Sequence, residues 1–273
     1  MPVIRIAFAG LLAVILHGEA TAEGINVLQL SRDSGVKLVS QSGNSSGSGF
    51  FVADQYVLTC FHVVAALTLQ GSSVNWRLYP DLQAVLPSGE IINAIVVSIP
   101  TQADASPLLE DFAFVKLKSK PQKSASIVAI ASESEVPQVG DEVVFSGYPL
   151  ATPGMVTHRG MVSGFDDSKS LIFVQASINK GNSGGALLNS QGHVVGIVSM
   201  REGGISQGLN DLTVHIDSTA SQGNVRIMGV DPLQATKAII QTLDKYISTG
   251  IGYARSIKFA REYLDKNKEL LKN

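Results

Sequence analysis

Short apolar runs, each bounded by Gly, Asn, Asp, Ser or Pro, recur along most of the chain. Runs of about five residues at roughly ten-residue spacing indicate the strands of a β-barrel or sandwich and argue against a βαβ fold. The predicted strands cover residues 36–40, 49–52, 56–59, 82–86, 90–99, 112–117, 142–146, 156–163, 170–175 and 194–198. Between them we expect loops at 42–48 and 101–109, a helical turn at 60–66, and a linker between two halves at 118–126.

The last quarter of the chain has a different pattern. Residues 201–228 are rich in Gly, Ser, Asn and Gln, with weak strand signals at 212–216 and 225–228. Asp231 and Pro232 are a good N-cap and first residue for a helix that ends before Gly250. A final helix is predicted over 257–271, with Ile257, Ala260, Tyr263 and Leu264 on one side. Its charged face is interpreted as solvated surface, with partner docking as the alternative.

The N-terminus has the pattern of a signal peptide. Arg5 precedes an uninterrupted apolar run over residues 6–16, and Ala20-Thr21-Ala22 offers small residues at a cleavage site. The run is too short to cross a bilayer of about 30 Å as a helix, so no stable membrane span is expected. An uncleaved anchor or a buried helix is the alternative. We therefore expect residues 1–22 to be removed and the protein to be exported, to the periplasm or beyond.

Composition describes a well-buried globular protein. The 273 residues are 45% hydrophobic and 16% charged, and the net charge of −2 gives no electrostatic reason to expect nucleic acid or an anionic membrane as a partner. The one cysteine, Cys60, excludes an intramolecular disulfide, which points to a bacterial exported enzyme. Cys60 is interpreted as a small buried hydrophobic residue, with a redox role as the alternative. No metal or other cofactor is expected, because the histidines show no ligand spacing with acids or the cysteine.

The candidate chemistry centres on Ser183, which lies in residues 178–187 (INKGNSGGAL). Flanking glycines allow a tight turn whose N–H groups converge on an oxyanion, although a plain glycine-rich hairpin is the alternative. A serine nucleophile needs a histidine base and a carboxylate to orient that base. His62 follows a buried strand and Asp111 precedes one, so these are the candidates. The remaining histidines are expected to be lost with the signal or to be structural: His17, His158, His193 and His215.

The order His62, Asp111, Ser183 is that of chymotrypsin-type enzymes. The segments around these residues, together with matches at 139–141, 147–149, 157–163 and 250–254, make the chain resemble a trypsin-fold serine protease of the bacterial HtrA/Deg kind over about residues 43–264. The resemblance implies an all-β fold of two six-stranded antiparallel barrels, over residues 23–120 and 121–273, with the site in the cleft between them. It implies that His62 is the general base, Asp111 its orienting group and Ser183 the nucleophile. The N–H groups of Gly181 and Ser183 would form the oxyanion hole.

The chain departs from the family pattern at several points. Lys180 stands where proline is usual, so the oxyanion loop is expected to be more mobile or reshaped by the charge. Cys60 and Phe61 replace small or polar residues, and 205–249 is a helical insertion. Because about seventeen residues follow the last strand region, no PDZ domain is expected. The primary pocket is expected to favour small or medium aliphatic side chains. Its predicted lining is Ser177, Lys180, Ile197, Ser199 and Met200, with Gly203 as a further candidate.

These observations favour an exported serine endopeptidase that hydrolyses protein or peptide substrates through an acyl-enzyme. Two alternatives remain open. The first is a catalytically latent member of the fold that binds a partner. The second is an esterase that uses the same three residues. Reaction with a serine-directed probe separates the first alternative from an enzyme, and substrate choice separates the second.

Overall fold

The computed structural model describes residues 26–70, 73–101, 106–150, 152–199, 204–221, 223, 226–246 and 250–271. The predicted signal peptide, residues 1–22, therefore lies outside the described residues, as do Met200 and Gly203 of the predicted primary pocket.

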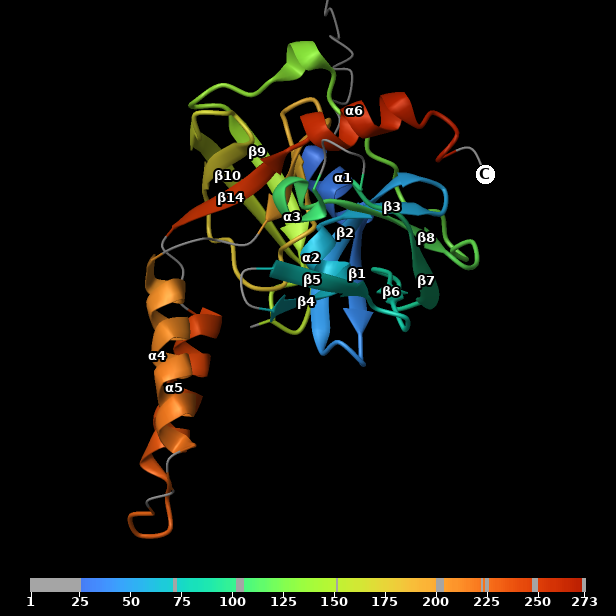
Figure 1. The fold of residues 1–273 in the computed structure, drawn as a ribbon. Coiled ribbons are helices and arrows are strands. Elements are labelled where there is room, and N and C mark those ends of the chain that lie inside the picture. Colours follow the sequence, from blue (N-terminus) through green and yellow to red (C-terminus); the bar gives the residue numbers. More distant parts are fainter. Residues whose placement is uncertain are drawn as a thin grey trace, which may run out of the picture.

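The strands close into two antiparallel barrels of six strands each, which confirms the predicted fold (Figure 1). The first barrel contains, in spatial order, β1 (Gly35–Ser40), β2 (Ser45–Ala53), β3 (Tyr56–Thr59), β8 (Ala113–Leu117), β7 (Ile91–Ser98) and β6 (Gln83–Val85). The second contains β10 (Val156–Phe165), β11 (Leu171–Gln175), β14 (Ile251–Ser256), β13 (Val194–Ser199), β12 (Ala186–Leu188) and β9 (Glu142–Gly147). The first barrel is formed by strands from the first half of the chain and the second barrel by strands from the second half. The last strand, β14, follows the insertion.

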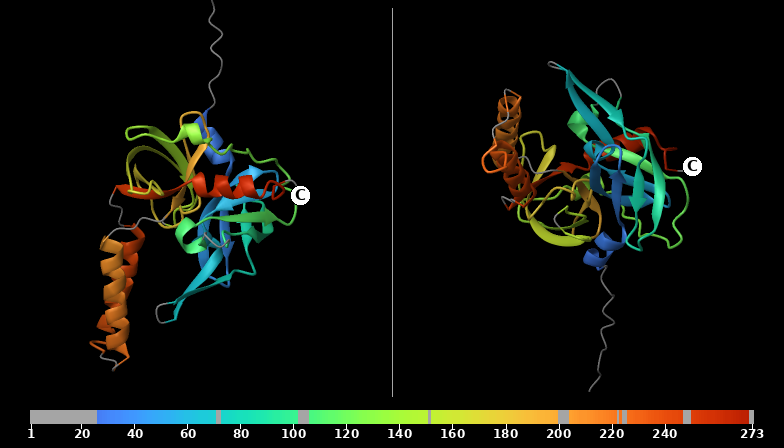
Figure 2. Two further views of the ribbon diagram at one scale, coloured as in Figure 1. Left: turned by 45° about the horizontal axis from the view of Figure 1, so that its top comes forward. Right: turned by 90° about the horizontal axis from the view of Figure 1, so that it is seen from below.

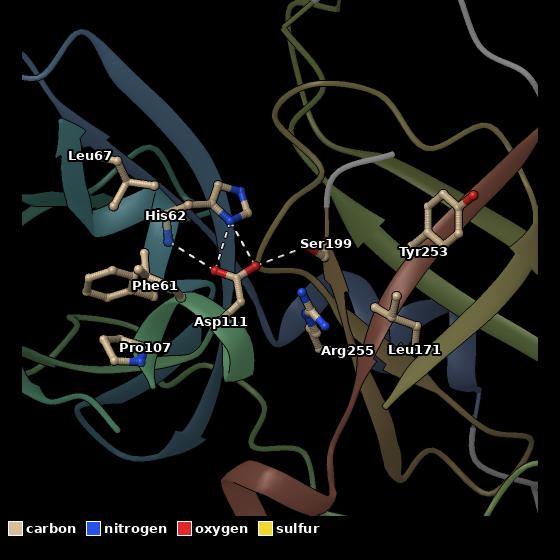
Figure 3. Close-up of a pocket in the computed structure, with 10 residues that line it drawn as sticks. Phe61, His62, Leu67, Pro107, Asp111, Leu171, Ser199, Tyr253 and Arg255 are labelled. Atoms are coloured by element: carbon tan, nitrogen blue, oxygen red, sulfur yellow. Dashed lines mark hydrogen bonds and ion pairs between the residues drawn. The ribbon is translucent and has the colours of Figure 1, made fainter. Parts of the chain in front are cut away.

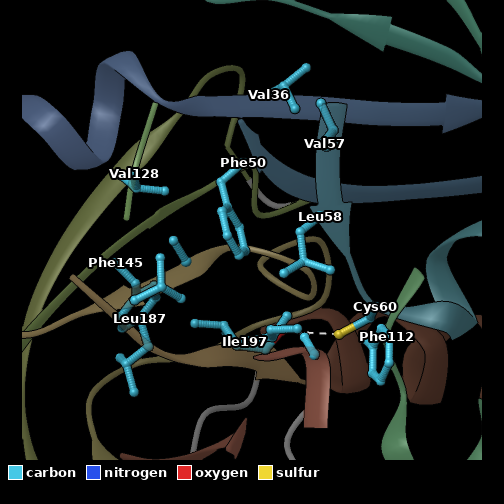
Figure 4. Close-up of a cluster of buried hydrophobic side chains, with 14 of the residues drawn as sticks. Val36, Phe50, Val57, Leu58, Cys60, Phe112, Val128, Phe145, Leu187 and Ile197 are labelled. Carbon is cyan, nitrogen blue, oxygen red and sulfur yellow. Dashed lines mark hydrogen bonds between the residues drawn. The ribbon is translucent and has the colours of Figure 1, made fainter. Parts of the chain in front are cut away.

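Alternate residues of the strands fill the barrels. In β7, Ile92 and Ala94 are buried while Ile91 and Ile95 are exposed, as the two-residue period of a strand requires. Phe50 of β2 and Phe145 of β9 belong to the same cluster of buried side chains (Figure 4). The two barrels therefore pack over one shared core, which fixes the seam between them.

The C-terminal helix α6 (Lys258–Lys266) crosses from the second barrel to the first (Figure 1). Its Tyr263 ring lies 5.6 Å from the ring of Phe112 and 6.1 Å from that of Phe114, and its hydroxyl is hydrogen-bonded to Ser98. This packing agrees with the predicted apolar side of the helix. The helix ends at Lys266 and not at residue 271, where the prediction placed its end.

Three predictions differ from the structure, because distant partners override local composition. The loop predicted at 42–48 is partly strand, since β2 begins at Ser45 and pairs with β1 from Ser40 onward. The strand predicted at 212–216 lies inside the helix α4 (Gly204–Ala220). No strand covers the described residues 226–228, where Ile227 and Val230 form a bridge around a turn.

Several elements are not indicated by the sequence pattern. A two-stranded sheet, β4–β5, projects beside the first barrel. The predicted helical turn at 60–66 is the short helix α2 (Phe61–Val64), after which the chain continues directly as β4. The unpredicted elements are β4 (Ala65–Gln70), β5 (Ser73–Leu78), β12, α1 (Val27–Asp33), α3 (Pro107–Glu110) and the 3₁₀ helix η1 (Glu133–Glu135).

The insertion forms an arm of two helices, α4 and α5 (Pro232–Tyr246), that projects away from the barrels (Figures 1 and 2). Asp231 Oδ1 accepts the N–H groups of Leu233 and Gln234 at 2.9 and 3.2 Å, so the predicted N-cap is confirmed. Ile216 and Ile240 are each 4% exposed, yet neither belongs to the barrel core. The arm is therefore held by contacts of its own.

Removal of the arm is expected to leave the barrels folded. Ser199 at the end of β13 pairs with Tyr253 of β14, so a short Gly/Ser linker can replace residues 201–249. Because the arm contributes nothing to the barrel core, the melting temperature should change by less than about 4 °C, the shift that about 1 kcal/mol produces in a domain of this size. Calorimetry of the deletion variant beside the full chain tests this. Loss of a cooperative transition would show that the barrels need the arm.

Candidate active site

The three predicted chemical residues sit where elements of the two barrels meet. His62 lies in α2, directly after β3, and Asp111 follows α3 with φ +47°, a left-handed conformation that Asp tolerates better than most residues. Ser183 lies in the turn before β12 and is 5% exposed. A rigid strand or helix end therefore adjoins each of them.

His62 and Asp111 are paired through three contacts. His62 Nδ1 lies 2.9 Å from each carboxylate oxygen of Asp111, and the backbone N–H of His62 donates to Oδ1 at 3.1 Å. An ionised carboxylate only accepts hydrogen bonds, so the proton of the neutral imidazole is on Nδ1. This tautomer leaves Nε2 as an acceptor for a nucleophile's proton.

The environment of Asp111 keeps it ionised. Burial raises its pKa, but the neighbouring His62, by charge and hydrogen bonding, and the Ser199 hydroxyl outweigh burial and hold the pKa below the usual range. Ser199, the last residue of β13, reaches across the seam between the barrels, and its Oγ donates to Asp111 Oδ2 at 3.0 Å (Figure 3). Both carboxylate oxygens are thus occupied, and the carboxylate has one orientation.

Backbone contacts fix the serine turn to the first barrel. The N–H of Ser48 donates to the carbonyl of Ser183 at 2.7 Å, and Ser48 Oγ donates to the carbonyl of Gly181 at 2.7 Å. The side chain of Val63, next to His62, lies against Gly47 of the same strand, β2. Ser183 and His62 therefore face the same seam. Within the described residues, Ser183 Oγ makes no hydrogen bond to His62, which is common in the absence of substrate.

A hydrogen bond to the neighbouring loop fixes the peptide between Lys180 and Gly181. The carbonyl of Lys180 accepts the N–H of Leu150 at 2.8 Å, and a trans peptide then directs the N–H of Gly181 the opposite way. Gly181 has φ +97°. Among the backbone hydrogen bonds of the described residues, none has the N–H of Gly181 or Ser183 as its donor.

Four of the predicted pocket residues lie in the described part of the chain: Ser177, Lys180, Ile197 and Ser199. Of these four, Ser199 alone lines the pocket beside His62 and Asp111, which has a volume of about 200 Å³ (Figure 3). Ile197 is 1% exposed and belongs to the barrel core, so its placement in the pocket is wrong. Ser177 and Lys180 are exposed. The pocket's other lining residues are not indicated by the sequence: Phe61, Leu67, Pro107, Leu108, Leu171, Tyr253 and Arg255.

Cys60 lies beneath the paired residues. Potential ligand atoms of Cys60, His62 and Asp111 lie within 4.8 Å of one another, so the folded chain does bring the cysteine, an acid and a histidine together. Sequence spacing does not indicate this cluster, because Asp111 lies far along the chain from Cys60 and His62 and only the fold brings it beside them. The cluster is nonetheless poorly suited to a metal. His62 Nδ1 and both Asp111 oxygens are already engaged in hydrogen bonds with each other. Burial, and after it the charge of Asp111, raises the pKa of the Cys60 thiol well above its usual value, so the thiol stays protonated.

The Cys60 thiol is expected to be inert in the folded protein. Its raised pKa keeps it protonated at pH 8, near the ordinary pKa of a cysteine, and it is 0% exposed. A disulfide reagent such as dithionitrobenzoate should therefore react with the native protein at least about 100-fold more slowly than with the protein in urea. Cys60→Ala provides the background. Stoichiometric reaction of the native protein within minutes would contradict the assignment.

Comparisons with known proteins identify the family and agree with the fold. Residues 47–197 match the family model of the trypsin-like peptidase domain. The chain is 33% identical over 189 residues to a putative protease Do-like 14 from Arabidopsis thaliana, covering 65% of this chain and 40% of that protein. It is 28% identical over 203 residues to a probable periplasmic serine endoprotease DegP-like from Bartonella henselae, covering 72% of this chain and 33% of that protein. The chain thus spans less than half the length of these relatives.

A solved structure is also similar. The serine endoprotease from Yersinia pestis superposes with a TM-score of 0.56 at 21% identity, covering 88% of this chain and 64% of that chain. At this identity the likeness concerns the fold, and it matches the double barrel described above.

Proposed function

Because the chain belongs to the trypsin-like peptidase family, we propose that it is an exported serine endopeptidase that cleaves protein or peptide substrates. The observation that carries the proposal is the pairing of His62 Nδ1 with Asp111, which leaves Nε2 free to act as a base at the seam where Ser183 lies.

The proposed reaction proceeds in two halves. Ser183 Oγ attacks the scissile carbonyl while His62 Nε2 takes its proton, and Asp111 stabilises the imidazolium that forms. The tetrahedral oxyanion accepts the N–H groups of Gly181 and Ser183. His62 then protonates the leaving amine, which gives an acyl-enzyme on Ser183, and a water activated by His62 hydrolyses the ester in the same way.

Export rests on residues 1–22 and on the periplasmic names of relatives such as the Bartonella henselae protein. No helix in the described part of the chain is both long and apolar enough to cross a bilayer. For the residue before the scissile bond we propose a small or medium aliphatic side chain, because the exposed segment around Ser177 and Lys180 offers no acid to select a basic one.

Labelling with a fluorophosphonate probe tests the proposal. The mature protein should be labelled, whereas Ser183→Ala and His62→Ala should not, because the probe reports a nucleophilic serine activated by its base. Absence of labelling in all three would favour the latent binding protein. Labelling accompanied by hydrolysis of acyl esters but not of unfolded protein would favour the esterase.

A further inference from the structure

A half-buried arginine stands beside the paired His62 and Asp111. Arg255 belongs to β14 and lines the same pocket as those two residues (Figure 3). Tyr253 and Arg255 lie on one face of the strand, while the alternate residues Gly252 and Ala254 are buried in the barrel. The strand period therefore directs Arg255 out of the barrel and toward the pocket.

Arg255 has no anionic partner among the described residues. Its Nε is buried and makes no hydrogen bond, and none of the ion pairs between described residues includes the guanidinium. Asp111, the acid that lines the same pocket, is already occupied, because His62 and Ser199 take both of its oxygens. A half-buried charge without a partner is unfavourable, so its presence at this place points to a ligand that supplies the missing anion.

The remaining walls define the kind of anion. They are mostly apolar and come from both barrels: Phe61, Leu67, Pro107 and Leu108 from the first, and Leu171 and Tyr253 from the second. A free inorganic anion would gain little from such walls. A carboxylate on an aliphatic stem satisfies both parts, since a guanidinium binds a carboxylate through two parallel hydrogen bonds while the stem removes apolar surface from water.

We propose that Arg255 binds a carboxylate of the peptide substrate, so that the protein selects peptides with a glutamate close to the scissile bond. The inference rests on the proposed function only in that it takes the ligand to be a substrate. The binding of a carboxylate by Arg255 is argued from the pocket itself. The carboxylate has two possible sources, the side chain of Glu and the C-terminus of a peptide. Both carry the same group, and the experiment separates them.

The test measures binding to the Ser183→Ala protein, in which no cleavage occurs. Acetylated hexapeptides of Ala and Leu carry Glu, or Gln as its neutral isostere, at each position in turn, either as C-terminal amides or as free acids. At one position of the amide series, Glu should bind about tenfold or more tightly than Gln, the effect of a hydrogen bond to a charged group. If the C-terminus is the ligand, the advantage appears instead for the free acids, regardless of where Glu stands.

Substitution of Arg255 provides the second arm. In Ser183→Ala/Arg255→Gln the preference should fall to about one, and Arg255→Lys should restore part of it, because lysine keeps the charge but not the planar fork. Arg159→Gln is the matched control, since Arg159 is an exposed arginine of β10 paired with Glu142. It should leave the preference intact. Calorimetric melting of each variant excludes misfolding as the cause.

The proposal would be overturned if Glu and Gln peptides bound equally at every position and the free acids bound no more tightly than the amides. A preference for the carboxylate that survives Arg255→Gln would also overturn it. Failure to detect binding of any carboxylate peptide would overturn it as well. Failure of the proposed function looks different. In that case the wild-type protein would resist the fluorophosphonate, while the Ser183→Ala protein would still prefer carboxylate peptides through Arg255.

Discussion

The Asp111→Asn variant is expected to lose about 10⁴-fold in kcat while keeping its fold, by analogy with the same substitution in a serine protease triad. The backbone N–H of His62, 3.1 Å from Oδ1, can only donate, so the amide oxygen of Asn must take that position. The amide nitrogen then takes the position of Oδ2, 2.9 Å from His62 Nδ1. There it donates to Nδ1, and the imidazole proton moves to Nε2. The base can then no longer accept the proton of Ser183.

The measurement is the rate of fluorophosphonate labelling together with hydrolysis of a labelled unfolded protein. Ser199→Ala serves as the comparison, because it removes one hydrogen bond to Oδ2 without changing the tautomer, and its loss should be much smaller. If Asp111→Asn reacted as fast as the parent protein, Asp111 would not orient His62. A large fall in melting temperature would instead show that the substitution disturbs the shared core.

The pairing of His62 with Asp111 could be predicted from sequence because each residue adjoins a recognisable buried strand. The turn around Ser183 could also be predicted, since the glycines that form it lie next to Ser183 in the sequence. Arg255 could not be found in this way. Its role depends on β14 pairing with β13 and β11, so that a residue near the end of the chain reaches the pocket of His62.

Ser199 and Ile197 illustrate the same limit from the other side. The sequence predicts both in the substrate pocket because they lie in the apolar strand after the nucleophile, yet their burial differs sharply. Ile197 is directed into the shared core, whereas Ser199 ends the strand at the seam and donates to Asp111. A sequence indicates that a strand has two faces, but which face meets the other barrel depends on register and on the second barrel's position.

The strand predicted at 212–216 lies in a helix of the arm, and the prediction is wrong because it considers the segment without its partner. The segment 212–216 contains β-branched residues that favour a strand when considered alone. In the structure it is helical, and the helix that contains it contacts α5. Asp217, the next residue, forms an ion pair with Lys237 of α5 at 2.6 Å. The helix is thus stabilised by a partner that comes later in the chain, which local propensity cannot include.

The Gly181→Ala variant should lose about 10²- to 10³-fold in kcat, the effect of removing one oxyanion donor. Gly181 has φ +97°, and a Cβ at this position would lie 2.2 Å from the carbonyl oxygen of Tyr148. Backbone atoms cannot yield as a flexible side chain does, so the peptide must rotate. The carbonyl of Lys180 would then leave the N–H of Leu150, and the N–H of Gly181 would turn away from the oxyanion.

Gly140→Ala is the matched control for this variant. Gly140 has φ +98°, in the turn before β9, but a Cβ there meets no atom within 4 Å. Both substitutions therefore impose the left-handed strain of an alanine, about 1–2 kcal/mol, and only Gly181→Ala adds the clash beside Ser183. Melting temperatures of both variants and their rates of probe labelling separate strain from catalysis. If the two variants labelled equally fast, the turn from Lys180 to Ser183 would not supply the oxyanion hole, and Lys180 would have to be considered as a group that reshapes it.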